Sequence, residues 1–140
     1  MRYSILFFLV MSSLSFCMAD PKADWQKKRQ KVQDTCQKNS KIDPKIVEDI
    51  KTNGQFHDPD KKVKDFFYCL EVYHEFIDLQ GNLQLETVKK HLKAVGVSDE
   101  KINEVTKRCA IKDKVKDTSL MAVAYFQCYA RHLPRDVLVI

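Results

Sequence analysis

The sequence predicts an all-α fold, in which six helices form one compact domain that disulfide bonds hold together. The chain of 140 residues contains only three glycines and four prolines, so few positions interrupt helices. Apolar residues recur three and four positions apart over most of the chain, whereas the alternation typical of strands is rare. Four of the five cysteines lie in stretches with this helical spacing. These observations favour a group of amphipathic helices over a sheet.

Residues 1–19 have the pattern of a secretory signal peptide. A positive charge lies near the start, and an apolar run follows at residues 5–11. Small or neutral residues precede an expected cleavage site between Ala19 and Asp20. The apolar run is too short to span a bilayer as a helix of the mature protein. We therefore expect residues 20–140 to form one secreted, extracellular domain.

Cys17 lies inside this leader. A lipoprotein signal would use a cysteine here, but the bulky Phe16 stands where such a signal has a small residue. We therefore expect Cys17 to be discarded with the leader, which leaves an even number of cysteines. An even number in a short exported chain favours disulfide bonds over metal binding or thiol chemistry. The remaining cysteines are Cys36, Cys69, Cys109 and Cys128.

The first two helices follow the leader. The first is expected at about residues 24–39. Its inner side is formed by Trp25, Val32 and Cys36. Asp43 and Pro44 mark the start of the second helix, since aspartate is a good N-cap and proline suits the first helical position. Gly54 ends this helix, because glycine readily adopts the left-handed conformation at a helix C-terminus.

The third helix has the clearest apolar stripe of the chain. Its inner positions follow the i, i+3, i+4, i+7 spacing, and Cys69 lies beside them. They are Val63, Phe66, Phe67, Leu70 and Tyr73. A polar break at residues 80–82 precedes the fourth helix, which ends at Gly96. The apolar side of the fourth helix is formed by Leu85, Val88 and Leu92.

Ser98 is the expected N-cap of the fifth helix, whose acidic first turn suits the positive end of the helix dipole. Its inner side is formed by Ile102, Val105 and Cys109. Asp117 or Thr118 caps the sixth helix. The sixth helix is apolar almost all round, so we expect it to be buried on most sides. Pro134 ends it and leaves a tail at residues 135–140.

The sequence offers no recognisable catalytic or metal-binding motif. Its four histidines are scattered, without the i, i+4 pair or the compact cluster of a metal site. His74 and Glu75 begin like a zinc-protease motif, but Asp78 stands in place of the second histidine. No Gly-x-Ser-x-Gly turn and no glycine-rich phosphate loop occurs. We therefore expect no enzymatic activity, no catalytic residue, no metal and no cofactor.

The charge distribution and hydropathy also limit the partners. The formal net charge is +5, but the lysines are spread over nearly every helix instead of forming one basic patch. No second apolar run is long enough to cross a membrane. We therefore expect neither nucleic-acid binding nor membrane insertion.

The order of the helices and cysteines, together with three short phrases, resembles the insect odorant-binding proteins, which include the pheromone-binding and general odorant-binding proteins. The phrases are Gly81-Asn82-Leu83, Val95-Gly96-Val97-Ser98 and Phe126-Gln127-Cys128. The resemblance covers the whole of the expected mature chain. It implies a compact helical domain that encloses an apolar cavity.

One departure from the family pattern is informative. Six-cysteine members of the family have two further cysteines, bonded to each other, at the positions of Asp65 and Ser119. The absence of both places this chain with the four-cysteine Minus-C subgroup. The disulfide pairs that the resemblance implies are Cys36–Cys69 and Cys109–Cys128. Four cysteines allow three connectivities, and the second pair joins helices that a short turn makes antiparallel neighbours.

The resemblance implies a carrier that binds and transports small hydrophobic ligands, such as odorants, pheromones or other lipophilic semiochemicals. Taken singly, the apolar residues of the helices are better explained as core, but the resemblance makes some of them candidates for the cavity lining. The candidate ligand-binding residues are Leu85, Val88, Leu92, Ile102, Val105, Leu120, Val123, Ala124, Tyr125, Val137, Leu138 and Ile140. A hydroxyl of Tyr73, Tyr125 or Tyr129 would add one orienting hydrogen bond.

Two other functions compete with the carrier. The first is a secreted helical interaction or structural protein without a ligand cavity, which would have a filled core and an exposed apolar patch for a surface partner. The second is a small secreted enzyme. For the carrier itself, a membrane receptor or a weak homodimer stays open as a further partner.

Two roles are open for the tail at residues 135–140. Burial of its four apolar side chains contributes about 1.5–3 kcal/mol each, whereas ordering each backbone residue costs about 1–2 kcal/mol. Because these terms nearly cancel, the tail could act as a lid that a ligand displaces. Alternatively, it is a permanent plug in the core.

Overall fold

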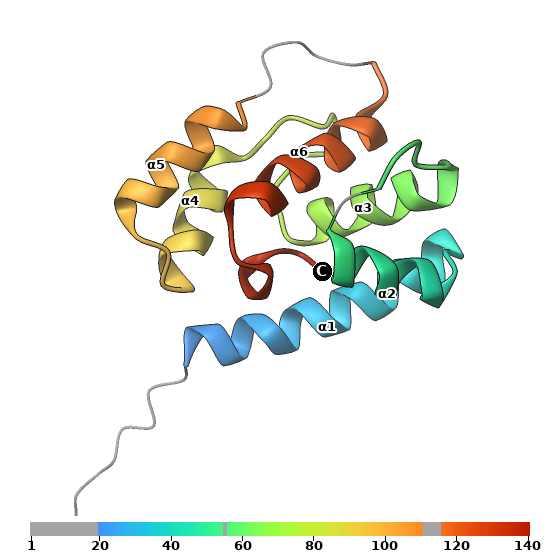
Figure 1. Cartoon of the computed structure of the whole chain (residues 1–140), viewed down its shortest axis with the longest axis horizontal. Coiled ribbons are helices and arrows are strands. Elements are labelled where there is room, and N and C mark those ends of the chain that lie inside the picture. Colours follow the sequence, from blue (N-terminus) through green and yellow to red (C-terminus); the bar gives the residue numbers. More distant parts are fainter. Residues whose placement is uncertain (1–19, 55, 111–115) are drawn as a thin grey trace, which may run out of the picture.

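The computed structural model describes residues 20–54, 56–110 and 116–140, and over these residues the protein is all-α. The expected leader and Cys17 lie outside the described residues. The helices are α1 (Pro21–Ser40), α2 (Pro44–Asn53), α3 (Lys61–Tyr73), α4 (Leu85–Ala94), α5 (Asp99–Arg108), α6 (Thr118–His132) and the short 3₁₀ helix η1 (Arg135–Val137) (Figure 1). The described part contains no strand, only an isolated antiparallel bridge between Ile77 and Leu83. The predicted fold class of six helices is confirmed.

Short polar side chains start most of the helices. The predicted N-caps of α2, α5 and α6 are confirmed: each side chain accepts a hydrogen bond from a backbone N–H of the first turn. These residues are Asp43, Ser98 and Asp117. Asp20 and Asp60 cap α1 and α3 in the same way. The first helix therefore begins at Pro21, earlier than predicted, because proline follows a good N-cap there.

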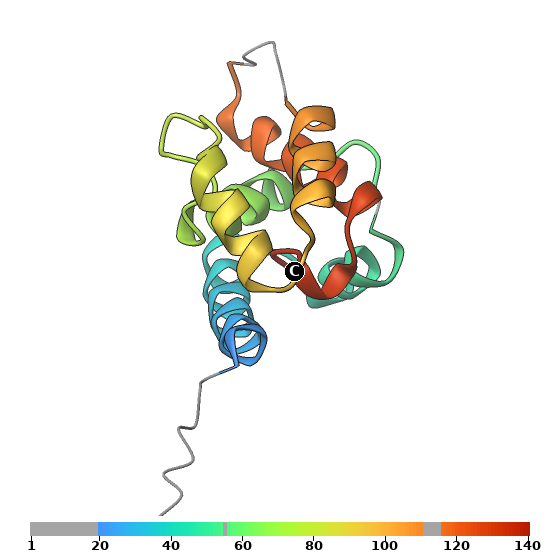
Figure 2. The ribbon, with the colours of Figure 1, turned by 90° about the vertical axis from the view of Figure 1, so that its left-hand side faces the viewer.

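Helix α3 lies at the centre of the fold. It packs against α6 on one side and against α1 on another, whereas α4 and α5 pair with each other and α5 also contacts α6 (Figures 1 and 2). After α6 the chain turns back, so that its C-terminal end lies among α1, α2 and α6 (Figure 1). This return of the chain places the C-terminal tail against the core.

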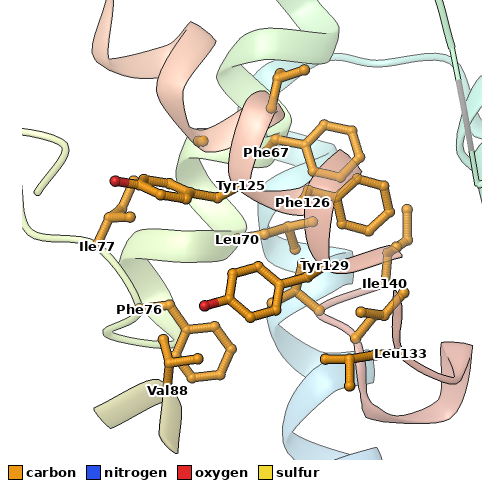
Figure 3. Packing of buried hydrophobic residues seen from close by; sticks show 14 of the residues in the cluster. Phe67, Leu70, Phe76, Ile77, Val88, Tyr125, Phe126, Tyr129, Leu133 and Ile140 are labelled. Carbon is orange, nitrogen blue, oxygen red and sulfur yellow. The ribbon is translucent and has the colours of Figure 1, made fainter. Parts of the chain in front are cut away.

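The core is built around the apolar stripe of α3. Phe66, Phe67 and Leu70 are completely buried. The ring of Phe67 packs against those of Phe56 and Phe126, with centroid distances of 5.3 Å and 4.4 Å. Figure 3 shows the rings of Phe67 and Phe126 side by side. Burial of each of these side chains contributes about 1.5–3 kcal/mol. The stripe read from the sequence is therefore the main contact surface of the domain.

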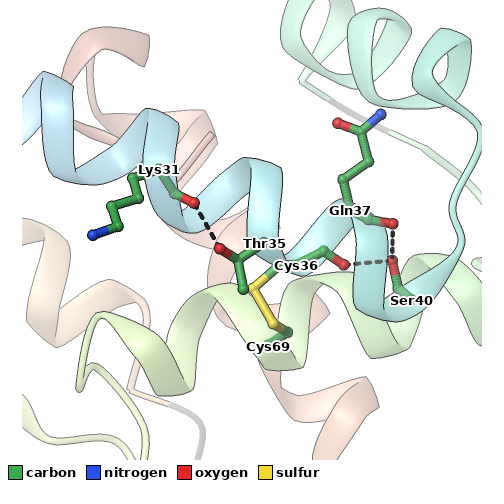
Figure 4. The surroundings of a disulfide bond; sticks show 6 residues. All are labelled: Lys31, Thr35, Cys36, Gln37, Ser40 and Cys69. Carbon is green, nitrogen blue, oxygen red and sulfur yellow. Dashed lines mark hydrogen bonds between the residues drawn. A yellow bond between two sulfur atoms is a disulfide. The ribbon is translucent and has the colours of Figure 1, made fainter.

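Two disulfide bonds join the helices, in the pairing that the resemblance implied. Cys36 on α1 is bonded to Cys69 on α3, with 5.6 Å between the Cα atoms (Figure 4). Cys109, at the end of α5, is bonded to Cys128 on α6, with a Cα separation of 5.7 Å. Each bond closes a loop of a length that contributes on the order of 3–4 kcal/mol in the chain-entropy model.

Candidate ligand-binding site

A small buried cavity of about 30 Å³ lies between α3, α4, α6 and the C-terminal tail. Its walls are mostly apolar, and the polar exceptions come from α3 and α6. The lining residues are Glu71, Phe76, Leu83, Val88, Tyr125, Phe126, Tyr129, Val137, Leu138 and Val139. The lining thus combines residues that are far apart in the sequence.

The segment between α3 and α4 supplies one wall through a turn organised by Asp78. The Asp78 carboxylate accepts hydrogen bonds from the backbone N–H groups of Gln80 and Asn82, at 2.9 Å and 2.8 Å. The carbonyl of Phe76 accepts a 2.7 Å bond from the N–H of Gln84. These bonds hold Phe76 in the wall. Asp78, which stands in place of the second histidine of the zinc-protease motif, therefore stabilises this turn.

Helix α6 supplies the opposite wall. Tyr125 and Tyr129 are one helical turn apart, so both lie on the same face of α6. Both residues are buried, with exposed fractions of 5% and 8%. Figure 3 shows the ring of Tyr129 extending from α6 toward Phe76 and Val88. The periodicity of α6 therefore directs two phenol groups to one side of the core.

The C-terminal tail forms the third wall, and Arg29 of α1 holds it. The guanidinium donates hydrogen bonds to the backbone carbonyls of Arg135, Leu138 and Ile140, at 3.1–3.4 Å. A ring nitrogen of His91 on α4 lies 3.1 Å from the Val137 carbonyl. The last four residues of the chain are all buried. The tail is therefore an ordered part of the core that also lines the cavity.

Arg135 fixes the other side of the tail. Its guanidinium donates hydrogen bonds to the carbonyls of Ile50 and Lys51 at the end of α2. It also lies against Gly54, the left-handed C-cap of α2, where a Cβ atom would come within 2.6 Å of Arg135 Nη2. Gly54 is favoured here by its left-handed backbone conformation, whereas the end of the flexible Arg135 side chain can shift away from a Cβ atom.

Glu71 is the one ionisable carboxyl in the lining. It is fully enclosed on α3, and this burial raises the pKa of its carboxyl to about 8. Burial also raises the pKa of the Tyr129 hydroxyl, and the charge of Glu71 raises it further. The same two causes raise the pKa of Tyr125. At neutral pH the cavity therefore contains neutral, protonated polar groups.

An aromatic cluster borders the cavity through Phe76. The Trp25 ring lies 4.5 Å from that of His74 and 4.0 Å from that of His91. His74 is 2% exposed, and within the described part of the chain neither of its ring nitrogens has a hydrogen-bond partner. Burial lowers the pKa of His74 to about 3, with smaller contributions from the positive charges of Lys28, His91 and Arg29. His74 is therefore a neutral core residue.

One group in the described residues has the spacing of metal ligands. It consists of Cys109, Cys128 and His132. The two sulfur atoms are bonded to each other, and thiolates rather than disulfide sulfurs bind metals. This group is therefore a disulfide with a neighbouring histidine and does not support a metal site.

Residues 18–132 of the chain match the model of the PBP/GOBP family. The chain belongs to this family, the insect odorant-binding proteins. Family members are secreted binding proteins and not enzymes. No curated protein and no solved structure was found to match the chain. No helix in the described ranges is long and apolar enough to cross a membrane.

The structure of this odorant-binding family member places the predicted site residues in three groups. Those that line the cavity are Val88, Tyr125, Val137 and Leu138. Those buried elsewhere in the core are Leu92, Ile102, Val105, Val123 and Ile140. Those at the surface or partly exposed are Leu85, Leu120 and Ala124. The sequence thus indicated the helices that surround this cavity more reliably than the helix faces that line it.

Five lining residues of this PBP/GOBP protein were not named as candidates from the sequence. They are Glu71, Phe76, Leu83, Phe126 and Val139. A signal for Glu71 was present, because it lies four positions after Phe67 and so continues the inner face of α3. Phe76 and Leu83 belong to an irregular segment, for which helical periodicity gives no signal.

Proposed function

We propose that this protein is an extracellular carrier that binds small hydrophobic ligands, such as odorants or other lipophilic semiochemicals, in the cavity between α3, α4, α6 and the tail. The observation that carries the proposal is the mostly apolar lining of this cavity, with polar groups confined to Glu71 and two tyrosines. Apolar walls with a few polar groups are typical of small-molecule sites. Membership of the PBP/GOBP family supports the same function.

The volume of the cavity determines how far its walls must open to admit a ligand. A space of about 30 Å³ accommodates water-sized molecules, whereas benzene occupies engineered cavities of about 150 Å³. An odorant of a dozen carbons therefore requires the walls to move apart. The tail is the wall best suited to move, because apolar burial and chain ordering nearly cancel in its free energy.

The expected affinity follows from the burial of apolar surface. Each square ångström of ligand surface removed from water contributes about 25 cal/mol, which gives micromolar binding for a medium-sized ligand after the cost of opening the site. Discrimination between ligands that differ by one methylene is expected to be weak, at about 1–3 kcal/mol.

The experiment is displacement of a solvatochromic apolar probe from the purified secreted form. Val88 lines the cavity on α4, so Val88→Phe should fill the space and weaken probe binding several-fold. Ala124→Phe is the matched control, since Ala124 lies on α6 outside the lining and is partly buried. Helical circular dichroism should be unchanged in both variants. If the wild-type protein binds no probe as a monomer, the carrier proposal fails and a surface partner becomes the better explanation.

A further inference from the structure

Two polar side chains of the cavity lining have no hydrogen-bond partner among the described residues. The Tyr129 hydroxyl is buried, and none of the described residues bonds to it. Glu71 is 5% exposed, and no group of the described residues is hydrogen-bonded to its carboxyl. A buried polar group without a partner is unfavourable by about 1–3 kcal/mol. The buried hydroxyl of Tyr129 therefore calls for an explanation, and the carboxyl of Glu71 belongs to the lining of the same cavity.

We propose that the Glu71 carboxyl and the Tyr129 hydroxyl form a pair of hydrogen-bond donors that recognises the carbonyl oxygen of an otherwise apolar ligand. This inference rests on the proposed function, because it specifies the ligand class of the same cavity. The two groups come from different helices, α3 and α6, and both belong to the lining. The remaining walls are apolar apart from Tyr125, so a ligand with one polar end fits them.

The protonation state of Glu71 makes it a donor. No cation of the described residues pairs with its carboxyl, and ionising an isolated buried carboxyl is unfavourable. Its pKa of about 8 keeps the group protonated at neutral pH. The titratable groups that interact with it are Tyr125 and Tyr129 of α6, which are also protonated at that pH. A carboxyl kept neutral by an apolar site can donate a hydrogen bond.

The other charged groups near the cavity interact with one another and not with Glu71. On the α1 side, Lys28 and Arg29 interact with His74 at the end of α3, and His91 of α4 belongs to the same set. Asp136 of the tail interacts with Lys22 and Arg29 of α1. The raised pKa of Glu71 comes from burial and not from these charged groups. The ionisation of Glu71 is therefore governed by its own environment.

A carbonyl oxygen suits this pair because it has two lone pairs and no proton. It can accept from Glu71 and Tyr129 together, which satisfies both groups. An alcohol can accept from one group and donate to the other, so it remains the closest competitor. The two ligand classes respond differently when Glu71 ionises, since a carboxylate repels a carbonyl oxygen but accepts a hydrogen bond from a hydroxyl.

The test compares three ligands of equal chain length in the probe-displacement assay. They are methyl heptyl ketone, the secondary alcohol obtained by its reduction, and nonane. We expect the affinity of the ketone relative to nonane to fall about tenfold in Tyr129→Phe and in Glu71→Leu, as the loss of one buried hydrogen bond implies. Tyr73→Phe is the control and should leave this ratio unchanged, because Tyr73 is 52% exposed and outside the lining.

The pH dependence separates ketone from alcohol. In the wild type, the affinity of the ketone relative to the alcohol should fall several-fold between about pH 7 and pH 9, as Glu71 ionises near pH 8. Glu71→Gln retains an N–H donor at every pH, so its ratio should stay constant over this range.

The outcomes distinguish this inference from the carrier proposal on which it rests. If none of the three ligands displaces the probe, the carrier proposal itself fails. If all three bind and the ratios are the same in the wild type, Tyr129→Phe and Glu71→Leu, the cavity binds ligands without this donor pair and the inference is wrong. Loss of the ketone preference in Tyr125→Phe but not in Tyr129→Phe would also overturn it, because a different hydroxyl would then be the donor.

Discussion

Lys64 Nζ lies 3.2 Å from Asp117 Oδ2, and this ion pair connects the first turns of α3 and α6. The other oxygen of Asp117 caps α6, with bonds of 3.0 Å and 3.1 Å from the N–H groups of Ser119 and Leu120. Asp65 follows Lys64 directly, and Ser119 lies two residues after Asp117; the sequence resemblance suggested these two positions for the further disulfide of six-cysteine family members. A cap and an ion pair therefore link the two helices close to Asp65 and Ser119.

We expect Asp117→Ala to destabilise the protein more than Lys64→Ala does. The first change removes the cap, which costs about 1 kcal/mol, together with the ion pair. The second removes only a partly exposed ion pair, worth less than about 1 kcal/mol. Asp117→Asn is the control, because asparagine caps helices without a charge. Urea unfolding at neutral pH measures all three, and equal losses in Asp117→Ala and Asp117→Asn would show that charge matters more than capping.

The loss of folding stability at acidic pH should depend on the protonation of His74. Its folded pKa of about 3 lies below its usual value of 6.5, so the neutral form is favoured in the fold. The corresponding stability is present above about pH 6.5 and is lost as the pH falls toward 3, with a slope of up to about 1.4 kcal/mol per pH unit.

In His74→Phe this acid-induced loss should be smaller than in the wild type, as measured by urea unfolding at a series of pH values. His57→Phe is the control, because His57 is exposed. An identical pH profile in the wild type and His74→Phe would mean that another group determines the acid sensitivity.

Glu71 should make folding stability depend on pH in the opposite direction to His74. Its folded pKa of about 8 lies above its ordinary value of 4.5, so folding favours the protonated form. The stability associated with it is fully present below about pH 4.5 and is lost as the pH rises through 8. The stability of Glu71→Gln relative to the wild type should therefore increase over that range. Equal differences at about pH 5 and pH 8 would show that Glu71 is ionised in the fold throughout.

The fold was largely predictable because its signals are local. Asp43 with Pro44, Ser98 and Asp117 each start a helix through bonds within the first turn, and these positions were read correctly from sequence alone. Gly54 ends α2 in the left-handed conformation for an equally local reason. Local rules are therefore sufficient to divide this chain into helices.

The lining of the cavity depends on contacts between distant residues, which no local rule describes. Val137 was proposed as a lining residue from its apolar character, but its position depends on His91, far away in the sequence. Leu120 was proposed on the same grounds and is 37% exposed, because the turn at the start of α6 leaves it at the surface. Glu71 was passed over because a carboxylate is rarely fully buried.

The tail gives the last prediction, in which removal of residues 135–140 lowers the melting temperature even without ligand. The four terminal side chains are 3–7% exposed, and the truncation uncovers the cavity wall behind them. A net loss of about 2 kcal/mol would lower the melting temperature by roughly 5–10 °C in a domain of this size. Differential scanning calorimetry of the truncated and intact proteins measures this change.

Arg29→Gln tests whether the tail also acts as a lid. This change removes the guanidinium that binds three carbonyls of the tail, but it leaves the apolar side chains of the tail in place. Probe release in stopped-flow mixing should therefore become faster, with a smaller loss of melting temperature than in the truncation. A tail that only plugs the core would give a lower melting temperature in the truncated protein and unchanged release in Arg29→Gln. If neither variant changes release or stability, the tail has neither role, and the ligand must enter through another wall of the cavity.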